Sequence, residues 1–191
     1  MIGQGMNRGE YECCVEIFGH DQVIPILQDM ADTLLQDKIK KHIGSRINFR
    51  VVQDGENRQI LGHEATFFDI LSTKDKQYGF TIEYGEGKRL TCCGDEPYND
   101  QNSQYVKGSE WLMLEAFCLD GEADVFDPYE KHHSTVKEAC ERAQELEIPN
   151  LILYHTEDTH MERRKELYEA EGRQYYRGNL CVPDDLESYI F

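Results

Sequence analysis

Long apolar runs, basic residues and paired cysteines are all scarce in this 191-residue sequence. No apolar run approaches the roughly 20 residues that a membrane-spanning helix needs, and the start lacks the basic-then-apolar pattern of a signal peptide. Lys and Arg number 20 against 37 Asp and Glu, which gives a formal net charge of -17 and disfavours binding to a polyanion. We therefore expect a soluble, cytoplasmic protein with neither a membrane nor a nucleic acid as partner.

The seven cysteines form no Cys-x-x-Cys pair. Neighbouring residues of a strand point to opposite faces, so two adjacent cysteines cannot share one tetrahedral metal without distortion. The pattern predicts reduced, buried thiols in a reducing compartment. The residues are Cys13, Cys14, Cys92, Cys93, Cys118, Cys140 and Cys181.

The first half of the chain reads as a strand and a helix followed by short strands. Strand formers are dense at 11–19, and helical spacing over 23–43 places Ile26, Met30 and Leu34 on one stripe. From 47 to 90 the apolar period falls towards two, with turns such as "DGEN" and a clear hairpin at "YGEGKR". This order predicts the start of a layered α/β domain.

The second half alternates buried strands with amphipathic helices. "SEWLMLEAF" and "NLILYH" read as buried strands, and "HMERRKELYEAEG" as a charged helix ending in Gly172. In "STVKEACERAQELE", Thr135 and Glu138 form a capping box before a helix. We predict one domain over 1–191. The apolar face of the capped helix comprises Val136, Ala139, Cys140, Ala143 and Leu146.

Four short polar segments fall at predicted strand ends or at a helix start. Taken singly, each is explained by an ordinary turn or cap. Their order and separation resemble the second half of the metallo-β-lactamase superfamily, in its ribonuclease Z-like branch, over about 11–183. The segments are "GDEP" from Gly94, "LEAF" from Leu114, "HHST" from His132 and "YHTED" from Tyr154.

The resemblance implies a fold and a site. The fold class is α/β (α+β), a metallo-β-lactamase-like αββα sandwich with mixed β-sheets flanked by helices. Asp95 corresponds to an aspartate that bridges two metal ions, and His155 to a ligand of one of them. His133 corresponds to a residue beside the scissile phosphate, and Glu115 is assigned to catalysis with it. The implied cofactor is zinc, with manganese as the alternative.

The chain departs from the superfamily at two places. It has no His-x-His-x-Asp-His run, so we expect an N-terminally incomplete, truncated domain that corresponds to the last two-thirds of the fold. Leu71, Ser72 and Thr73 stand where a further metal-binding histidine is expected. His160 is expected to be solvated on its charged helix.

Three functions remain open. The first is a metal-dependent hydrolase, phosphodiesterase-like on a small substrate and impaired by its missing ligands. The second is a non-catalytic binding or assembly module that keeps the fold without metals. Such an incomplete sandwich would leave strand edges and apolar faces uncovered, so we expect a homodimer or a state bound to a partner. The third, with least support, is a Cys-His nucleophile that uses Cys118 or Cys140 with His133.

Overall fold

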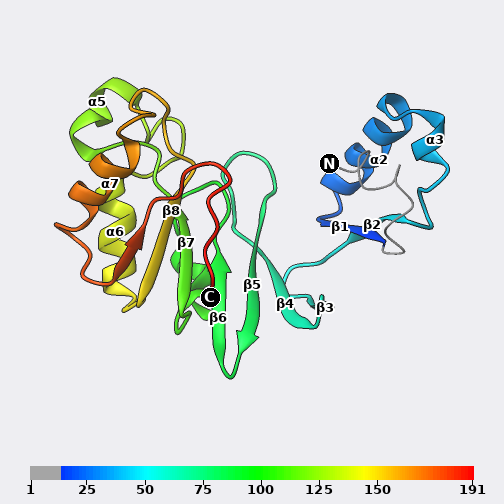
Figure 1. Ribbon diagram of the computed structural model, residues 1–191, viewed down its shortest axis with the longest axis horizontal. Coiled ribbons are helices and arrows are strands. Elements are labelled where there is room, and N and C mark those ends of the chain that lie inside the picture. The colour runs from blue at the N-terminus through cyan, green and yellow to red at the C-terminus, as the bar shows by residue number, and fades with distance from the viewer. Residues whose placement is uncertain (1–13) are drawn as a thin grey trace. The chain divides into compact units, whose positions relative to one another are not determined.

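The computed structural model describes residues 14–191, which divide into two compact units between Gln53 and Asp54 (Figure 1). The prediction of a single domain stays a prediction. The described part of the first unit is a strand–helix–strand motif whose two strands pair in parallel, with Val15 opposite Ile47. Its elements are β1 (Val15–Gly19), α2 (Val23–Leu34), α3 (Asp37–Lys40) and β2 (Ile47–Val51).

The prediction of one long helix over 23–43 is wrong in its extent. The structure ends α2 at Leu34 because Leu35 and Gln36 take extended backbone angles, with ψ of 145° and 147°. Lys40, in the short α3, folds back and donates from Nζ to the Asp32 carbonyl oxygen at 2.6 Å. This contact satisfies a carbonyl near the end of α2 that the broken helix leaves without a partner.

The second unit contains a seven-stranded mixed sheet in sequential order. The first, second, third and fourth strands pair antiparallel with one another, and the fourth to the seventh strands pair in parallel. The predicted hairpin is present as the β5–β6 turn, where Gly87 has a φ of 71°. The strands are β3 (Asn57–Ile60), β4 (His63–Asp69), β5 (Tyr78–Gly85), β6 (Lys88–Cys92), β7 (Trp111–Glu115), β8 (Asn150–Tyr154) and β9 (Asn179–Cys181).

Parallel strands need crossovers, and each of the three carries a helix. One short helix precedes β7, two lie between β7 and β8, and one precedes β9. The helices are α4 (Ser103–Val106), α5 (Ala123–Phe126), α6 (Val136–Glu145) and α7 (Arg164–Gly172), with 3₁₀ turns at Asp100–Asn102 and Asp120–Glu122.

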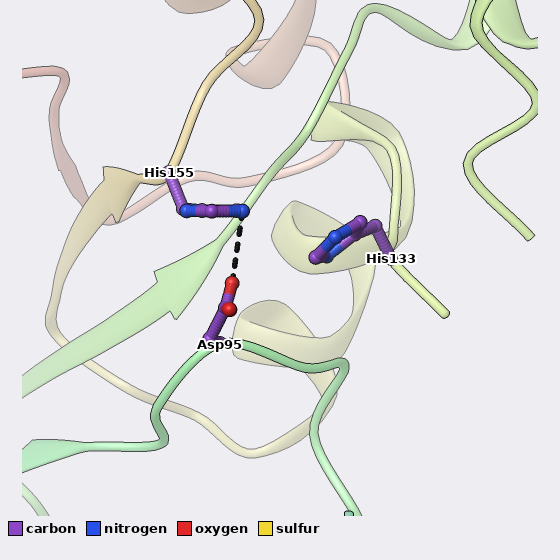
Figure 2. Close-up of side chains that lie close together, drawn as sticks. All are labelled: Asp95, His133 and His155. Atoms are coloured by element: carbon purple, nitrogen blue, oxygen red, sulfur yellow. Dashed lines mark ion pairs between the residues drawn. The ribbon is translucent and has the colours of Figure 1, made fainter. Parts of the chain in front are cut away.

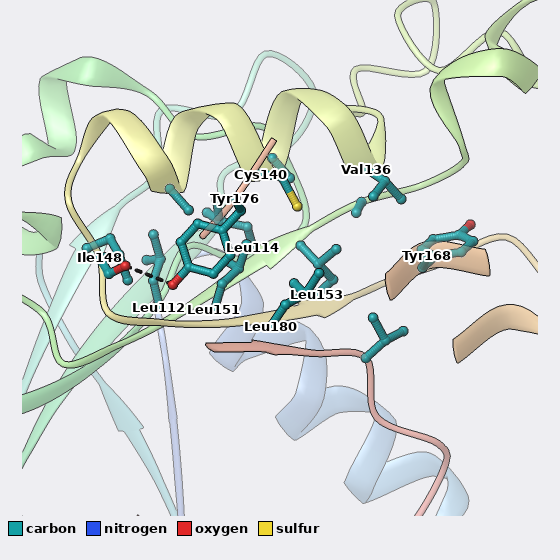
Figure 3. Close-up of a cluster of buried hydrophobic side chains, with 14 of the residues drawn as sticks. Leu112, Leu114, Val136, Cys140, Ile148, Leu151, Leu153, Tyr168, Tyr176 and Leu180 are labelled. Atoms are coloured by element: carbon teal, nitrogen blue, oxygen red, sulfur yellow. Dashed lines mark hydrogen bonds between the residues drawn. The ribbon is translucent and has the colours of Figure 1, made fainter. Parts of the chain in front are cut away.

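The core of this unit lies between the parallel strands and the α6–α7 pair (Figure 3). Two leucines of β7 and two of β8 point towards α6, as expected for strands that were predicted to be buried. They are Leu112, Leu114, Leu151 and Leu153. Gly172 lets α7 approach closely, since a Cβ there would lie 2.6 Å from the side chain of Leu180 and 2.8 Å from Cys140 Sγ. The predicted apolar face of α6 is buried except for half-buried Leu146.

Four of the predicted buried cysteines are buried: Cys93, Cys118, Cys140 and Cys181. Cys92 is half-buried and Cys14 is exposed, which corrects the prediction for Cys14, while Cys13 lies outside the described residues. The stripe on α2 is likewise exposed, at Ile26, Met30 and Leu34. Among the residues the structure describes, every helix is too short or too polar to span a bilayer.

Candidate metal centre

The functional residues proposed from the sequence gather at one edge of the large sheet. The neighbouring parallel strands β6, β7 and β8 present their carboxyl ends there, which is where open α/β sheets bind ligands. Asp95 follows β6, Glu115 ends β7 and His155 follows β8 directly. His133 reaches the same edge from the segment before α6. The structure therefore brings together all four residues, which lie far apart in the sequence.

Asp95, His133 and His155 form a cluster of possible metal ligands (Figure 2). One ligand atom from each residue lies within 4.8 Å of the other two. Asp95 Oδ1 is 2.8 Å from His155 Nε2, yet the buried oxygen has no aligned hydrogen bond. The ring centroids of His133 and His155 are 4.9 Å apart. Three potential ligand atoms thus converge, as an ion site requires, and two of them, on Asp95 and His155, also form an ion pair.

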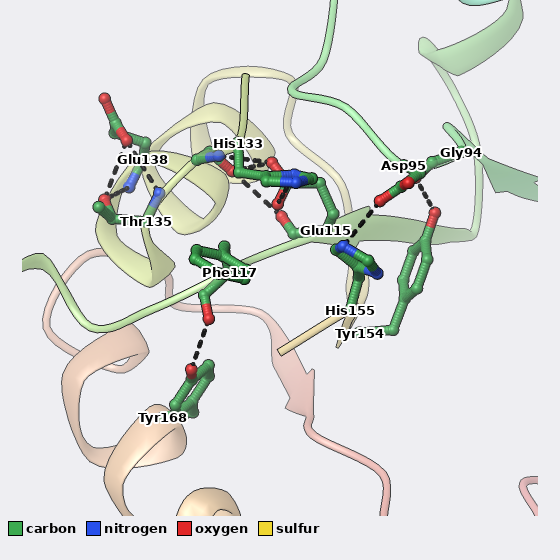
Figure 4. A network of polar contacts seen from close by, with 11 residues as sticks. Gly94, Asp95, Glu115, Phe117, His133, Thr135, Glu138, Tyr154, His155 and Tyr168 are labelled. Atoms are coloured by element: carbon green, nitrogen blue, oxygen red, sulfur yellow. Dashed lines mark hydrogen bonds and ion pairs between the residues drawn. The ribbon is translucent and has the colours of Figure 1, made fainter. Parts of the chain in front are cut away.

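Asp95 is placed by a sharp turn at Gly94. Gly94 has a φ of 76°, a left-handed conformation that glycine adopts freely. The Tyr154 hydroxyl donates to the Gly94 carbonyl oxygen and links the turn to the end of β8 (Figure 4). Since His155 follows Tyr154, this one contact ties both Asp95 and His155 to the same strand. The backbone at His155 is itself left-handed, with a φ of 54°, which is strain typical of functional sites.

His133 is held from two sides. The ring of Phe117 stacks on the imidazole with 5.0 Å between centroids, and Phe117 N–H donates to the Ser134 carbonyl at 2.9 Å. Below, Glu115 Oε1 accepts from the Ser134 N–H at 2.6 Å and from its hydroxyl at 2.7 Å. The side chain of His133 is consequently fixed in position before any ligand arrives.

Glu115 is almost fully buried, with 1% of its surface exposed. Burial raises the pKa of its carboxyl to about 7, although the two hydrogen bonds from Ser134 oppose the rise. Its second oxygen, Oε2, lies 3.5 Å from His133 Nδ1 and neither atom has a hydrogen-bond partner. The pKa of His133 is lowered, mainly by burial and then by the nearby charges of Lys74 and His155.

The segment where a further histidine was expected is tied down differently. Glu96 accepts from the Ser72 hydroxyl at 2.5 Å and from the Thr73 N–H at 3.2 Å. The Thr73 hydroxyl is 2.9 Å from His132 Nδ1. Leu71 is partly exposed and has a φ of 60°. Polar contacts therefore fix this loop beside the cluster.

Two other sequence expectations change. Cys118 and Cys140 are fully buried, and burial raises the pKa of each thiol to about 12, so neither is a thiolate nucleophile at neutral pH. His160 precedes α7 and is half-buried, and its Nε2 lies 2.6 Å from Glu122 Oε1. The prediction of a solvated helical histidine is wrong because this carboxylate holds it.

Sequence reasoning missed the residues that position the cluster. Phe117 and Ser134 lie inside the quoted motifs, and Tyr154 immediately precedes His155. The available signal was adjacency to a candidate site residue for Ser134 and Tyr154, and membership of the quoted motif for Phe117. Their roles depend on contacts between segments 16 to 60 residues apart, as the Phe117–His133 stacking and the Tyr154–Gly94 bond show.

No family model matches the chain. Two curated relatives do, both named ribonuclease Z. The protein of Thermococcus sibiricus is 26% identical over 107 residues, which are 56% of this chain and 33% of that protein. The protein of Cytophaga hutchinsonii is 32% identical over 80 residues, which are 42% of this chain and 25% of that protein. Each match thus spans a third or less of the relative.

Solved structures resemble the chain over most of its length. The metallo-β-lactamase fold protein YhfI of Bacillus subtilis aligns with a TM-score of 0.67 and 18% identity, over 88% of this chain and 62% of that one. A diphosphatase of the PhnP family gives 0.62 and 13%, over 93% and 60%. Human tRNase Z, short form, gives 0.62 and 14%, over 91% and 66%. These likenesses confirm the predicted fold.

Proposed function

We propose that this chain, which has the metallo-β-lactamase fold, is a metal-dependent hydrolase that cleaves a phosphodiester in a small substrate. The observation that carries the proposal is the convergence of Asp95, His133 and His155 at the carboxyl ends of parallel strands. The names of the similar proteins, ribonuclease Z and a diphosphatase, support phosphoryl chemistry. The net charge of -17 favours a small substrate over a polynucleotide.

The donor set fits a divalent cation. Asp95 and His155 would hold the ion, and one carboxylate with imidazoles suits zinc, or manganese as the harder alternative. A bound cation supplies Lewis-acid polarisation of a phosphoryl oxygen and lowers the pKa of water. His133 would donate a proton to the leaving oxygen, while Glu115 and Phe117 keep its ring in place.

We propose that this activity is weak. Hydrolytic sites with two metals need roughly three protein ligands for each ion, and the cluster offers three donors in all. With His133 left to donate the proton, Asp95 and His155 provide two ligands, which suit one weakly held cation with positions left open for substrate. A cytoplasmic location fits the six free thiols among residues 14–191, because thiols persist in a reducing compartment.

Metal content per chain tests the proposal. Protein purified without chelator and incubated with zinc or manganese should hold about one ion per chain, because Asp95 and His155 together form a single site. Asp95→Ala and His155→Ala should each lose the ion and the hydrolysis of bis(p-nitrophenyl) phosphate. His160→Ala is the matched control, because His160 also pairs with a carboxylate but lies outside the cluster.

A metal-free wild-type chain would contradict the hydrolase proposal and favour a second candidate, a binding or assembly module without metals. One observation favours that candidate. Asp95 Oδ1 and His155 Nε2 are 2.8 Å apart, whereas two ligands of one tetrahedral zinc lie roughly 3.4 Å apart when the bonds are about 2.1 Å. In such a module the two side chains would serve as an ion pair that joins the ends of β6 and β8.

A further inference from the structure

The loop between β4 and β5 is attached to the metal-ligand cluster from two sides at residues 71–73. On one side Glu96, which follows Asp95, accepts hydrogen bonds from a hydroxyl of this segment at 2.5 Å and from a backbone N–H at 3.2 Å. On the other side the Thr73 hydroxyl is 2.9 Å from Nδ1 of His132, the neighbour of a cluster histidine. These contacts fix the segment in which the sequence lacks the expected further histidine.

Lys74 follows this segment and carries a free ammonium group. Its backbone N–H donates to the Ser72 hydroxyl at 3.1 Å, and the residue is exposed. Burial is the main cause that lowers the pKa of His133 and the charge of Lys74 is the next, so the ammonium group lies near the imidazole. Within the part of the chain that the structure describes, the Lys74 side chain has no ion pair and no hydrogen bond.

Two other basic side chains near the cluster are already engaged. Arg164 donates to Thr156 Oγ1 at 3.2 Å and to a backbone carbonyl in the C-terminal segment at 3.0 Å. Lys131 donates from Nζ to the Phe126 carbonyl oxygen at 2.7 Å, and the same nitrogen lies 5.1 Å from the centre of the Phe117 ring. Neither residue can receive an anion without giving up these contacts.

A single cation leaves phosphoryl chemistry short of positive charge. Negative charge builds up on the phosphoryl oxygens during transfer, and sites with two metals neutralise it with both ions. This chain offers ligands for one cation, and the carboxylate of Asp95 cancels part of the charge of that ion. The histidine that would help to hold a second ion is missing from the segment that leads to Lys74.

An open depression of about 560 Å³ gives a substrate access to this position. Its wall includes Thr73, the residue before Lys74, and His133 of the cluster. The carboxylates of Glu96 and Asp100 are in the same wall and repel anions. An anionic group therefore finds attraction only where Lys74 and the metal ion approach it.

We propose that Lys74 binds the phosphoryl group of the substrate and supplies positive charge in place of a second metal ion. The identity of the substrate rests on the proposed hydrolase function, whereas binding of the anion needs no hydrolysis. An ammonium group is a compact charge with three donors, and charge-assisted hydrogen bonds from it suit phosphoryl oxygens.

The test is binding of dimethyl phosphate to the full chain, with and without zinc, measured by ³¹P NMR line broadening. We expect Lys74→Gln to weaken binding about tenfold, the usual loss for one hydrogen bond to a charged group. Lys74→Arg keeps the charge and should retain most of the binding. Lys76→Gln removes the same charge two residues later, where Nζ lies 5.3 Å from the centre of the Tyr78 ring, and should bind as the wild type does.

Zinc content separates this role from a structural one. Lys74→Gln should hold as much zinc as the wild type, because Lys74 is not part of the cluster. Equal binding of dimethyl phosphate by the wild type and Lys74→Gln would overturn the proposal. So would an equal loss in Lys76→Gln, or no binding by the wild type in either metal state. Binding that depends on Lys74 in a chain that holds no zinc would support the anion site while the hydrolase proposal fails.

Discussion

Gly94 shows how a single residue places the candidate metal ligand. Its φ of 76° costs a residue with a side chain about 1–2 kcal/mol. A Cβ at this position would also lie 3.0 Å from Ile70 Cδ1. Gly87 offers a matched comparison, because its φ is 71° but nothing lies within 4 Å of its Cβ position.

We predict that Gly94→Ala lowers the free energy of unfolding more than Gly87→Ala, by about 1 kcal/mol for the added crowding. Urea unfolding of both variants measures this difference. Gly94→Ala should also reduce metal content, because Asp95 is the next residue, while Gly87→Ala should not. Equal stability and equal metal content in the two variants would show that the turn does not position Asp95.

The candidate site was predictable only where its residues form local motifs. Asp95, His133 and His155 each follow a readable strand end or precede a capped helix. The bond from Tyr154 to Gly94 joins residues 60 positions apart, so no local pattern indicates it. No local pattern indicates the burial of Glu115 either, because it goes with hydrogen bonds from Ser134, which lies 19 residues later in the sequence.

At the scale of elements, the segment that leads into helix α6 carries His133 to the site. The predicted capping box is present: Thr135 Oγ1 accepts from the Glu138 N–H at 3.4 Å, and the Glu138 side chain accepts from the Thr135 N–H at 2.9 Å. This signal is local, which is why the sequence reveals it. The Val136 N–H also donates to the Cys118 carbonyl at 2.9 Å and joins the helix start to the segment that follows β7.

We predict that Thr135→Ala lowers the free energy of unfolding by about 1 kcal/mol, the usual value of an N-cap. Thr135→Ser retains the hydroxyl and should restore most of that loss. Chemical unfolding followed by circular dichroism measures both variants. If alanine and serine are equally stable at this position, the capping box does not stabilise α6.

Helix α2 shows the opposite case, because its end is not set by a local signal. Apolar spacing continues through Leu35, so the pattern predicts one helix to Ile43. The structure instead turns at Gln36 and uses Lys40 to satisfy the Asp32 carbonyl. The chain after α2 must return so that β2 can pair with β1, and this tertiary demand overrides helical spacing.

At the scale of the whole molecule, charge and exposed apolar surface act in opposite directions. A net charge of -17 opposes association at low salt. Ile26, Met30 and Leu34 of α2 are 58%, 49% and 71% exposed, and their spacing of four residues places them on one stripe. An apolar stripe is commonly an interaction surface, and pairing of two copies would cover the same stripe on each.

We predict a homodimer whose formation depends on this stripe and strengthens with salt, because salt screens the repulsion between two acidic chains. Sedimentation equilibrium at low and high salt measures the mass. Ile26→Glu with Met30→Glu should yield a monomer, since charge on the stripe cannot be buried. Met30→Glu alone should also weaken the dimer, whereas Gln28→Glu adds the same charge to an exposed position on the opposite side of α2 and should leave the dimer intact. A wild-type monomer at every salt concentration would contradict the dimer, and equal dissociation by Met30→Glu and Gln28→Glu would place the contact elsewhere.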